Sequence, residues 1–366
     1  MDPMSSKSGA PIRLQNLTKS YGQGDLLAVD DVSLDVQPGE FMTFLGPSGS
    51  GKTTTLNMIA GFVEVTSGSI YIDGQDIVGL PPHRRNIGVV FQQYALFPHM
   101  TAAENVAFPL ERRKVEKTEI SRRVAEALDM VRLGALGARY PKELSGGQQQ
   151  RVAVARSIVF GPRVLLLDEP LGALDKKLRE QLQGEIARLH RDLGITIIFV
   201  THDQEEALAL SDRIAVFNNG KVEQVGTAAE LYDHPRSLFV AEFLGDSTII
   251  DGVLGGDGRV RRPDGTSIPA CSKDGIASGS ECAIVVRPER IRVLEDENLA
   301  STDNLGVVGA TVSDVVYLGS HRKVLLDLDG GGRAVVKETA GSWSQAVPGQ
   351  DIRVSWAADN SVLVSR

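Results

Sequence analysis

The hydrophobic pattern of the chain changes near residue 243. Before it, continuous apolar runs alternate with stretches of helical periodicity. The runs EFMTFLG (40–46), RVLLLDEP (163–170) and ITIIFVTHD (195–203) are typical of parallel strands buried on both faces. Between the last two runs, helical spacing joins Leu178, Leu182, Ile186, Leu189 and Leu193. The pattern therefore predicts an α/β domain built from β–α–β units.

Other segments of this first part complete the predicted domain. KTTTLNMIAGF (52–62) predicts a helix, and VSLDV (32–36) alternates with period two, which favours an antiparallel patch added to the main sheet. From about 94 to 156 the pattern is mostly helical, with an apolar stripe at Val124, Leu128 and Val131. We interpret its charged runs, ERRK and SRR, as solvated helix surface.

After residue 243 glycines multiply and the helical pattern fades. The segments 281–294, 309–319 and 321–338 read as short strands, with a turn at Asp329–Gly330. They predict a separate all-β domain, in which two small five-strand barrels could fit. The expected organisation is a disordered tail (1–11), an α/β domain (12–242) with a helical subdomain (about 94–156), and the β domain (243–366).

Composition narrows the class of protein. The chain has 366 residues, which fits two domains, and its net charge of −8 argues against nucleic acid as a partner. A spanning helix needs about twenty apolar residues, and no run approaches that length. The first residues have no apolar core, so they do not form a secretory signal. We interpret Cys271 and Cys282 as reduced thiols, because no CxxC or Cys/His cluster accompanies them.

The sequence GPSGSGKT (46–53) matches the phosphate-binding loop G-x-x-x-x-G-K-[ST]. It lies between a predicted strand and a predicted helix, which is the context the motif requires. Its glycines allow the backbone to wrap a β-phosphate, while Lys52 reaches the β- and γ-phosphates and Thr53 offers a hydroxyl to Mg²⁺. A chance glycine-rich turn is the alternative, and the flanking elements argue against it.

Polar residues lie at the carboxyl ends of two predicted parallel strands. In open α/β sheets, ligands bind at these strand ends. Asp168 is placed to hold Mg²⁺, and Glu169 to polarise an attacking water, although both could instead form an acidic helix N-terminus. His202 ends the next strand. Asp203 is a good N-cap and Glu206 would complete a capping box, so that helix start needs no contribution from His202.

Two weaker candidates lie elsewhere. Gln92 follows an apolar strand and could touch Mg²⁺ or water through its amide, with Gln93 as a competitor. Tyr21 could stack on a base, but a lone aromatic in a turn is more often a packing residue.

A second anion site lies within ELSGGQQQRVAVAR (143–156). A serine and two glycines open a predicted helix, whose free N–H groups and positive dipole end favour a phosphate. One chain therefore carries two phosphate sites.

With these motifs in this order, residues 12 to about 240 resemble the ATP-binding cassette (ABC) family. The shared motifs are the phosphate loop, Gln92, LSGGQ (144–148), LLLDEP (165–170), LGALD (171–175) and His202. The resemblance implies the P-loop NTPase fold of that family, with ATP and Mg²⁺ as cofactors. It also implies head-to-tail pairing of two cassettes, in which Ser145, Gly146 and Gly147 of one copy bind the γ-phosphate held by the other.

The same resemblance implies individual roles. The residues expected to act in hydrolysis are Lys52, Gln92, Glu169 and His202, and those expected at Mg²⁺ are Thr53, Gln92 and Asp168. Nucleotide contacts are expected from Tyr21, Gly46, Pro47, Ser48, Gly49, Ser50, Gly51, Lys52, Thr53, Thr54, Ser145, Gly146, Gly147, Gln148 and Asp175. Gly172 stands where the family usually has serine, which removes one hydroxyl from the dimer contact.

The C-terminal part resembles the extra β domain (TOBE type) of bacterial importer ATPases, on the element VVRPERIRV (285–293). This implies an ATPase subunit on the cytoplasmic face of the bacterial inner membrane. Its expected partners are two transmembrane permease subunits, an external solute-binding protein and a second copy of itself, without nucleic acid. The stretches 174–186 and 243–252 lean towards polyamine importers, with iron(III), aminophosphonate, sugar and opine-like solutes as alternatives.

Two alternatives of another class stay open at this point. A soluble ABC ATPase of DNA repair or translation would usually carry two cassettes, a long coiled coil or a basic surface, and none of these is evident here. A regulatory module acting through the C-terminal domain could coexist with the importer role.

Overall fold

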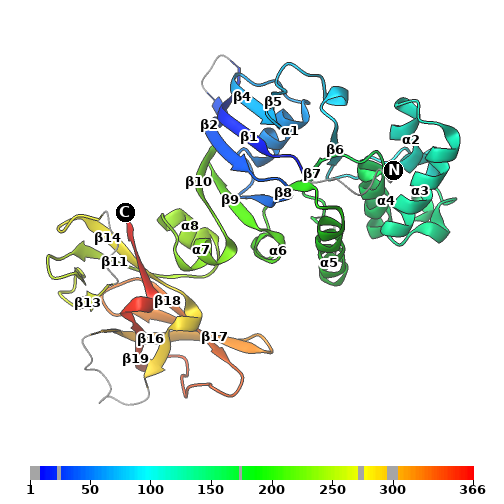
Figure 1. Cartoon of the computed structure of the whole chain (residues 1–366). Coiled ribbons are helices and arrows are strands. Elements are labelled where there is room, and N and C mark those ends of the chain that lie inside the picture. Colours follow the sequence, from blue (N-terminus) through cyan, green and yellow to red (C-terminus); the bar gives the residue numbers. More distant parts are fainter. Residues whose placement is uncertain (1–8, 23–25, 173–174, 271–275, 295–303) are drawn as a thin grey trace. The chain divides into compact units, whose positions relative to one another are not determined.

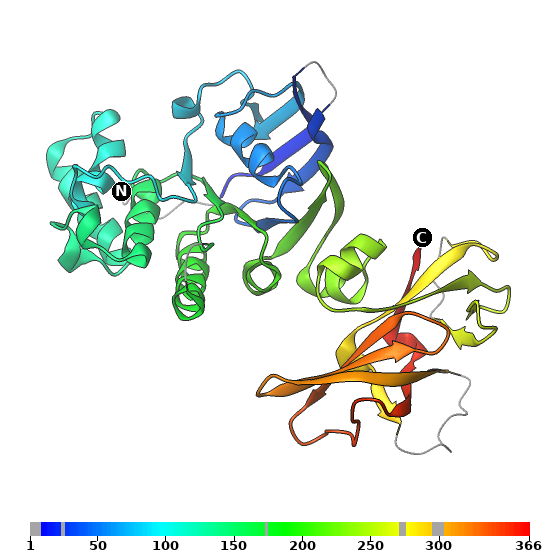
Figure 2. The same ribbon diagram turned by 180° about the vertical axis from the view of Figure 1, so that it is seen from behind.

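The computed structural model describes residues 9–22, 26–172, 175–270, 276–294 and 304–366. The chain divides into two compact units, Met1–Ala228 and Ala229–Arg366. Figures 1 and 2 show the chain from opposite sides. We describe each unit by itself.

A six-stranded sheet with the order β10-β9-β3-β8-β7-β6 forms the centre of the first unit. Its strands are β3 (Phe41–Leu45), β6 (Ile87–Val90), β7 (Val164–Asp168), β8 (Thr196–Thr201), β9 (Arg213–Asn218) and β10 (Lys221–Gly226). All neighbours pair in parallel except β9 and β10. The predicted parallel sheet is therefore confirmed, and the three apolar runs are its strands β3, β7 and β8.

The side chains of these strands alternate between two buried clusters. Leu165, Leu167 and Phe199 enter the cluster on one face, whereas Leu166 and Val200 enter the cluster on the other. Because successive residues of a strand point to opposite faces, a continuous apolar run is what a doubly covered sheet requires.

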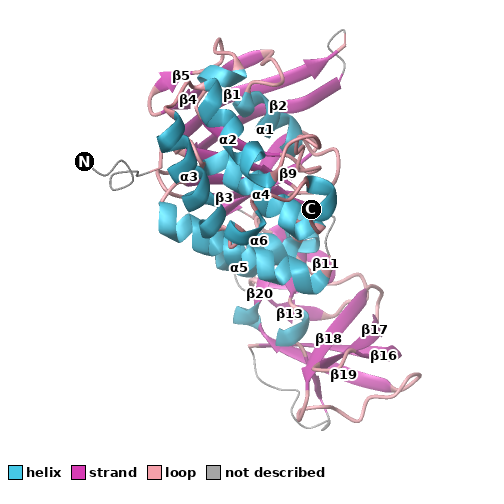
Figure 3. Ribbon diagram, turned by 90° about the vertical axis from the view of Figure 1, so that its right-hand side faces the viewer, coloured by secondary structure: helices cyan, strands magenta, loops and turns pink. Residues whose placement is uncertain are grey.

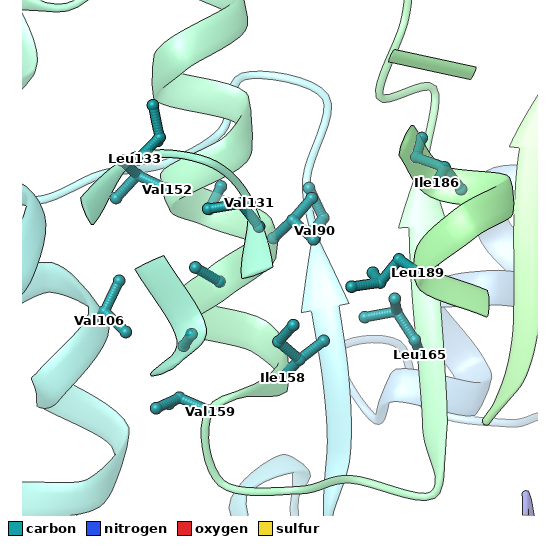
Figure 4. Close-up of a cluster of buried hydrophobic side chains, with 14 of the residues drawn as sticks. Val90, Val106, Val131, Leu133, Val152, Ile158, Val159, Leu165, Ile186 and Leu189 are labelled. Atoms are coloured by element: carbon teal, nitrogen blue, oxygen red, sulfur yellow. The ribbon is translucent and has the colours of Figure 1, made fainter. Parts of the chain in front are cut away.

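Helices cover both faces of the sheet. They are α1 (Lys52–Ala60), α2 (Ala102–Arg112), α3 (Lys117–Met130), α4 (Gly146–Ile158), α5 (Lys176–Leu193) and α6 (Gln204–Leu210), with short 3₁₀ turns at Pro82–Arg84, Gly134–Leu136 and Pro141–Glu143. Helices α2, α3 and α4 form one group between β6 and β7 in the sequence (Figure 1). Figure 4 shows Val152 and Ile158 of α4 in the same cluster as Val90, Leu165 and Leu189. The group is thus part of the core.

The expected antiparallel patch is a second sheet with the order β2-β1-β4-β5. Its strands are β1 (Ile12–Tyr21), β2 (Leu26–Val36), β4 (Ser67–Ile72) and β5 (Gln75–Asp76). The segment before β1 was expected to be a disordered tail. Residues 1–8 lie outside the described part, but Gly9 donates its N–H to Gly194 O (2.8 Å) and Ala10 is buried. At least these two residues belong to the folded domain.

The second unit consists mainly of two five-stranded antiparallel sheets (Figure 3). The first, in the order β13-β12-β11-β14-β20, is made of β11 (Thr248–Leu254), β12 (Arg259–Arg261), β13 (Ser267–Pro269), β14 (Glu281–Val286) and β20 (Ser361–Ser365). The second, in the order β15-β19-β16-β17-β18, is made of β15 (Arg292–Leu294), β16 (Leu305–Tyr317), β17 (His321–Leu328), β18 (Arg333–Thr339) and β19 (Asp351–Ala357). Short 3₁₀ turns lie at Pro288–Arg290 and Ala358–Asn360. The expected turn after Asp329 joins β17 to β18.

Two short helices, α7 (Ala228–Asp233) and α8 (Leu238–Phe243), belong to this second unit. The guanidinium of Arg287 donates to Tyr232 O (2.8 Å) and Ala241 O (2.8 Å) and lies 4.0 Å from the centre of the Tyr232 ring. Ala241 also packs against Val285 and Val364. The units divide at the first residue of α7, between Ala228 and Ala229, and these contacts fasten α7 and α8 to the β strands of the second unit.

Candidate nucleotide site

The predicted phosphate loop turns between β3 and α1. A Cβ atom on Gly46 would lie 2.3 Å from Phe217 O, and one on Gly51, whose φ is +100°, would lie 2.5 Å from Ala28 O. Any side chain at either position would collide with a neighbouring strand. The glycines therefore let the loop pass close to the backbone of β9 and β2.

Lys52 opens α1 and is only 4% exposed. Its ammonium group donates to Gly46 O (2.8 Å), Pro47 O (2.7 Å) and Ser50 Oγ (3.4 Å). Burial lowers the pKa of Lys52, while the carboxylates of Glu169 and Asp168 act in the opposite direction. The structure thus places a desolvated cation at the centre of the loop, with Ser48 and Gly49 exposed and Thr54 half-buried beside it.

Thr53 and Asp168 face each other across the loop and the end of β7. The hydroxyl of Thr53 donates to Asp168 Oδ1 at 3.1 Å. Burial raises the pKa of Asp168, the Thr53 hydrogen bond opposes that shift, and the charge of Glu169 adds to it. Within the described residues no cluster of three His, Cys, Asp or Glu could hold a metal alone. A hydroxyl and a carboxylate nevertheless suit Mg²⁺, which takes oxygen ligands and commonly completes its shell with phosphates and water.

Glu169 is held between two neighbouring strand ends. Its Oε2 accepts from Gln92 Nε2 (3.2 Å), and its Oε1 lies 3.3 Å from His202 Nδ1. Its backbone adopts φ +43°, a conformation that is costly for a residue with a side chain and that clusters at functional sites. Gln92, the weakest sequence candidate, and His202 are therefore brought together on one carboxylate.

The remaining predicted residues lie at element ends. Ser145 caps α4, accepting from Gln148 N while Gln148 Oε1 accepts from Ser145 N, so Gly146 and Gly147 form the first turn. Asp175 caps α5 by accepting from Leu178 N. Tyr21 is 47% exposed at the end of β1, with Lys19 Nζ 5.0 Å from its ring centre. Residues 173 and 174 of LGALD lie outside the described part.

The prediction of a capping box at Asp203 is half wrong. Asp203 caps α6 by accepting from Glu206 N (3.2 Å), but the Glu206 carboxylate accepts from Thr201 Oγ1 (2.7 Å) instead of returning to Asp203 N. Asp203 N donates to Thr201 Oγ1. Arg179 of α5 pairs with Asp203 (3.1 Å) and lies 3.6 Å from Glu206. Thr201, the last residue of β8, therefore binds the Glu206 carboxylate in place of the Asp203 backbone. No local sequence pattern indicates the additional contacts from Arg179.

A family model described as ABC transporter matches residues 29–172, and one described as TOBE domain matches residues 284–364. Curated relatives match over nearly the whole chain. "Spermidine/putrescine import ATP-binding protein PotA" of Rubrobacter xylanophilus is 49% identical over 98% of this chain and 95% of its own length. Proteins of the same name from Thermobifida fusca and Aliivibrio fischeri are 46% and 44% identical over 98% of this chain, covering 95% and 97% of their own lengths.

A solved structure is also similar. It is a dimeric ATP-binding cassette in a post-hydrolysis state bound to ADP and Pi, 38% identical with a TM-score of 0.54 over 59% of this chain and 98% of that one. None of the described helices of this chain is long and apolar enough to cross a membrane. Together the phosphate loop, the Glu169 cluster and the near-full-length relatives identify the chain as a member of the ATP-binding subunits of ABC transporters, with a cassette and a TOBE domain.

Proposed function

We propose that this chain is the ATP-hydrolysing subunit of a bacterial importer for spermidine and putrescine. The observation that carries the proposal is the similarity of 44–49% to spermidine/putrescine import ATP-binding proteins, which extends over both units. The alternative solutes left open by the sequence, iron(III), aminophosphonate, sugar and opine-like compounds, have no comparable support. The solute itself would contact the membrane partners, so the chain contributes the ATP-driven step.

The phosphate loop supplies the binding part of this activity. Lys52 now donates to loop carbonyls, and a bound nucleotide would offer its β- and γ-phosphate oxygens as replacements. Thr53 and Asp168 would hold Mg²⁺, which when bound supplies neutralisation of phosphate charge. The exposed ring of Tyr21 would stack on the adenine.

The Glu169 cluster supplies the hydrolytic part. A carboxylate that accepts from Gln92 and contacts His202 is fixed in direction, so it can orient a water and accept its proton. His202, more than half exposed, would steady the γ-phosphate. The desolvated cation of Lys52 would stabilise the charge that develops on the phosphate oxygens.

A second copy of the chain would complete each site. The free N–H groups at the start of α4 suit an anion. In the described part of the chain, the hydrogen bonds of Ser145 and Asp175 stay within their own helix ends. Pairing two cassettes head to tail would bring Ser145, Gly146 and Gly147 of one copy to the nucleotide of the other. Two permease subunits and an external solute-binding protein would complete the importer at the inner membrane's cytoplasmic face.

Uptake in source cells tests the proposal directly. Cells lacking the native gene are complemented with the wild-type chain, with Lys52→Ala or with Lys337→Ala, an exposed lysine of β18 that serves as the matched control. Uptake of labelled putrescine and spermidine is expected to fall to background with Lys52→Ala and to stay normal with Lys337→Ala.

The two parts of the proposal fail separately. Unchanged polyamine uptake with Lys52→Ala would refute the polyamine assignment. ATP hydrolysis by the purified wild-type chain is measured alongside, and its absence in complex with the permease subunits would refute the ATPase role.

A further inference from the structure

The segment that carries Gln92 has an unusual backbone. It links β6 to α2, and its residues Tyr94 and Ala95 both adopt positive φ, +57° and +44°. Tight turns hold it, with Tyr94 N donating to Phe91 O (2.9 Å) and Ala95 N donating to Gln93 O (2.6 Å). Two adjacent residues with side chains in the left-handed region carry a conformational cost. These internal turns alone do not offset that cost, so contacts from outside the segment are needed to stabilise the left-handed conformation of Tyr94 and Ala95.

Arg156 supplies those contacts from the last turn of α4. Its guanidinium donates to Ala95 O (2.9 Å) and Tyr94 O (3.0 Å), the carbonyls of the two left-handed residues, and lies 5.6 Å from the Phe97 ring centre. Desolvation lowers the pKa of Arg156, and no carboxylate of the described residues opposes that shift. A partly buried guanidinium whose main partners are two carbonyls binds them strongly, because an unpaired charge there is costly.

The far end of the segment is fixed separately. Asn105 of α2, which is fully buried, accepts from Phe97 N and donates to the carbonyls of Phe97 and Met100. Arg156 therefore acts on the part of the segment next to Gln92, and Gln92 contacts Glu169.

Helix α4 joins two functional points. Its first residue follows Ser145, and Arg156 lies in its last turn, about 16 Å of helix away from the cap at 1.5 Å per residue. We propose that Arg156 is a positioning residue that fastens the Gln92 segment to α4, so that a displacement of α4 by the second copy's nucleotide reaches Gln92 and, through it, Glu169. The inference rests on the proposed function, since it concerns control of ATP hydrolysis.

A double-mutant cycle on the full-length chain in its importer complex tests the coupling. Arg156→Met is expected to lower kcat roughly tenfold while KM for ATP stays within about twofold, because the nucleotide-binding loop is untouched. If Arg156 acts through Gln92, the double variant with Gln92→Ala hydrolyses ATP as slowly as Gln92→Ala alone. A further drop of the same factor in the double variant would overturn the proposal. Arg156→Lys, which can keep one of the two hydrogen bonds, should be intermediate.

Arg113→Met is the matched control. The Arg113 guanidinium also lies over an aromatic ring, at 3.8 Å from the Phe160 ring centre, and desolvation also lowers its pKa. Its hydrogen bonds go to Pro109 and Asn86, outside the Gln92 segment. Its kcat is expected to match the wild type.

Amide hydrogen exchange separates this inference from the proposed function. Arg156→Met should speed exchange at least threefold in peptides covering residues 91–98 and leave α1 and the first turns of α4 unchanged. Unchanged exchange would overturn the inference whatever the hydrolysis rates. Faster exchange in a chain that does not hydrolyse ATP even when wild type would instead refute the proposed function and the coupling with it.

Discussion

At the scale of single residues, the site depends on carboxylates in different surroundings. Asp168 is bonded by the Thr53 hydroxyl and is desolvated, whereas Glu169 lies between an amide and an imidazole. The first arrangement suits an oxygen ligand for a cation, and the second suits a group that must direct a water. Because Glu169 adopts a positive φ directly after the strand end, these two adjacent carboxylates meet different partners, which suits the different roles proposed for them.

Glu169→Gln is expected to lower ATP turnover by about 10²–10⁴-fold, because the amide cannot accept a proton from water. Binding of ATP should persist, since Lys52 and the loop are unchanged. Steady-state hydrolysis and equilibrium binding of a fluorescent ATP analogue measure the two effects. Glu205→Gln, an exposed residue of α6, is the control and should hydrolyse normally. Near-normal turnover in Glu169→Gln would show that another group activates the water.

At the scale of elements, the sequence pattern predicted the strands β3, β6, β7 and β8 of the parallel sheet, the helices α1 and α5, and the change to β structure, but not β9. These elements follow from local periodicity and from a motif whose flanks must be strand and helix. The pattern missed long-range polar contacts. No local pattern indicates the backbone carbonyls that Arg287 and Arg156 bind, because only the fold brings those carbonyls to them. The same limit explains why the sequence favours Gln92 only weakly. The partner of Glu206 is wrong for a local reason, because the Thr201 hydroxyl, five residues away, competes for its carboxylate.

The contact between α7 and the β strands can be followed by the titration of Tyr232, which lies in α7. Burial, and after it the hydrogen bond to Glu289, raise the pKa of Tyr232 from the ordinary value of 10.0 to about 12. Because the neutral phenol is favoured in the folded state, its contribution to stability is full below about pH 10 and is lost as pH rises through about 12. Ultraviolet titration should show late-titrating tyrosines that include Tyr232 and Tyr94, because burial also raises the pKa of Tyr94. Glu289→Gln is expected to lower the pKa of Tyr232, and Glu281→Gln, a change at an exposed glutamate of β14, is not. An unchanged late titration in Glu289→Gln would contradict the assigned contact.

At the scale of the whole molecule, the proposed function gives one chain two anion sites with separate roles. Lys52 of the phosphate loop and Ser145 at the start of α4 belong to different helices, and among the described residues the Ser145 side chain bonds only within its own helix cap. A dimer in which each nucleotide contacts both copies explains the presence of both.

Ser145→Asp should separate ATP binding from dimer formation. Aspartate caps a helix about as well as serine, so α4 keeps its start, but its charge repels a phosphate. In the Glu169→Gln background, ATP is expected to convert the chain to a dimer, as measured by light scattering. The added Ser145→Asp change should leave ATP binding to the monomer within about threefold and abolish the dimer. Ser237→Asp, which replaces the cap of α8, is the control. ATP-dependent dimers of the Ser145→Asp chain would contradict the shared site.

The tight seating of Gly46 against Phe217 O and of Gly51 against Ala28 O bears on the thermodynamics of nucleotide binding. Two strands already impose the curvature of the phosphate loop, so the ligand does not have to order it. Binding to the separate chain should then show little of the large negative heat-capacity change that accompanies coupled folding. Such a change would belong to the later meeting of two copies, when apolar surface is withdrawn from water. Calorimetry would thus distinguish nucleotide binding, with a small heat-capacity change, from dimer formation, with a large negative one.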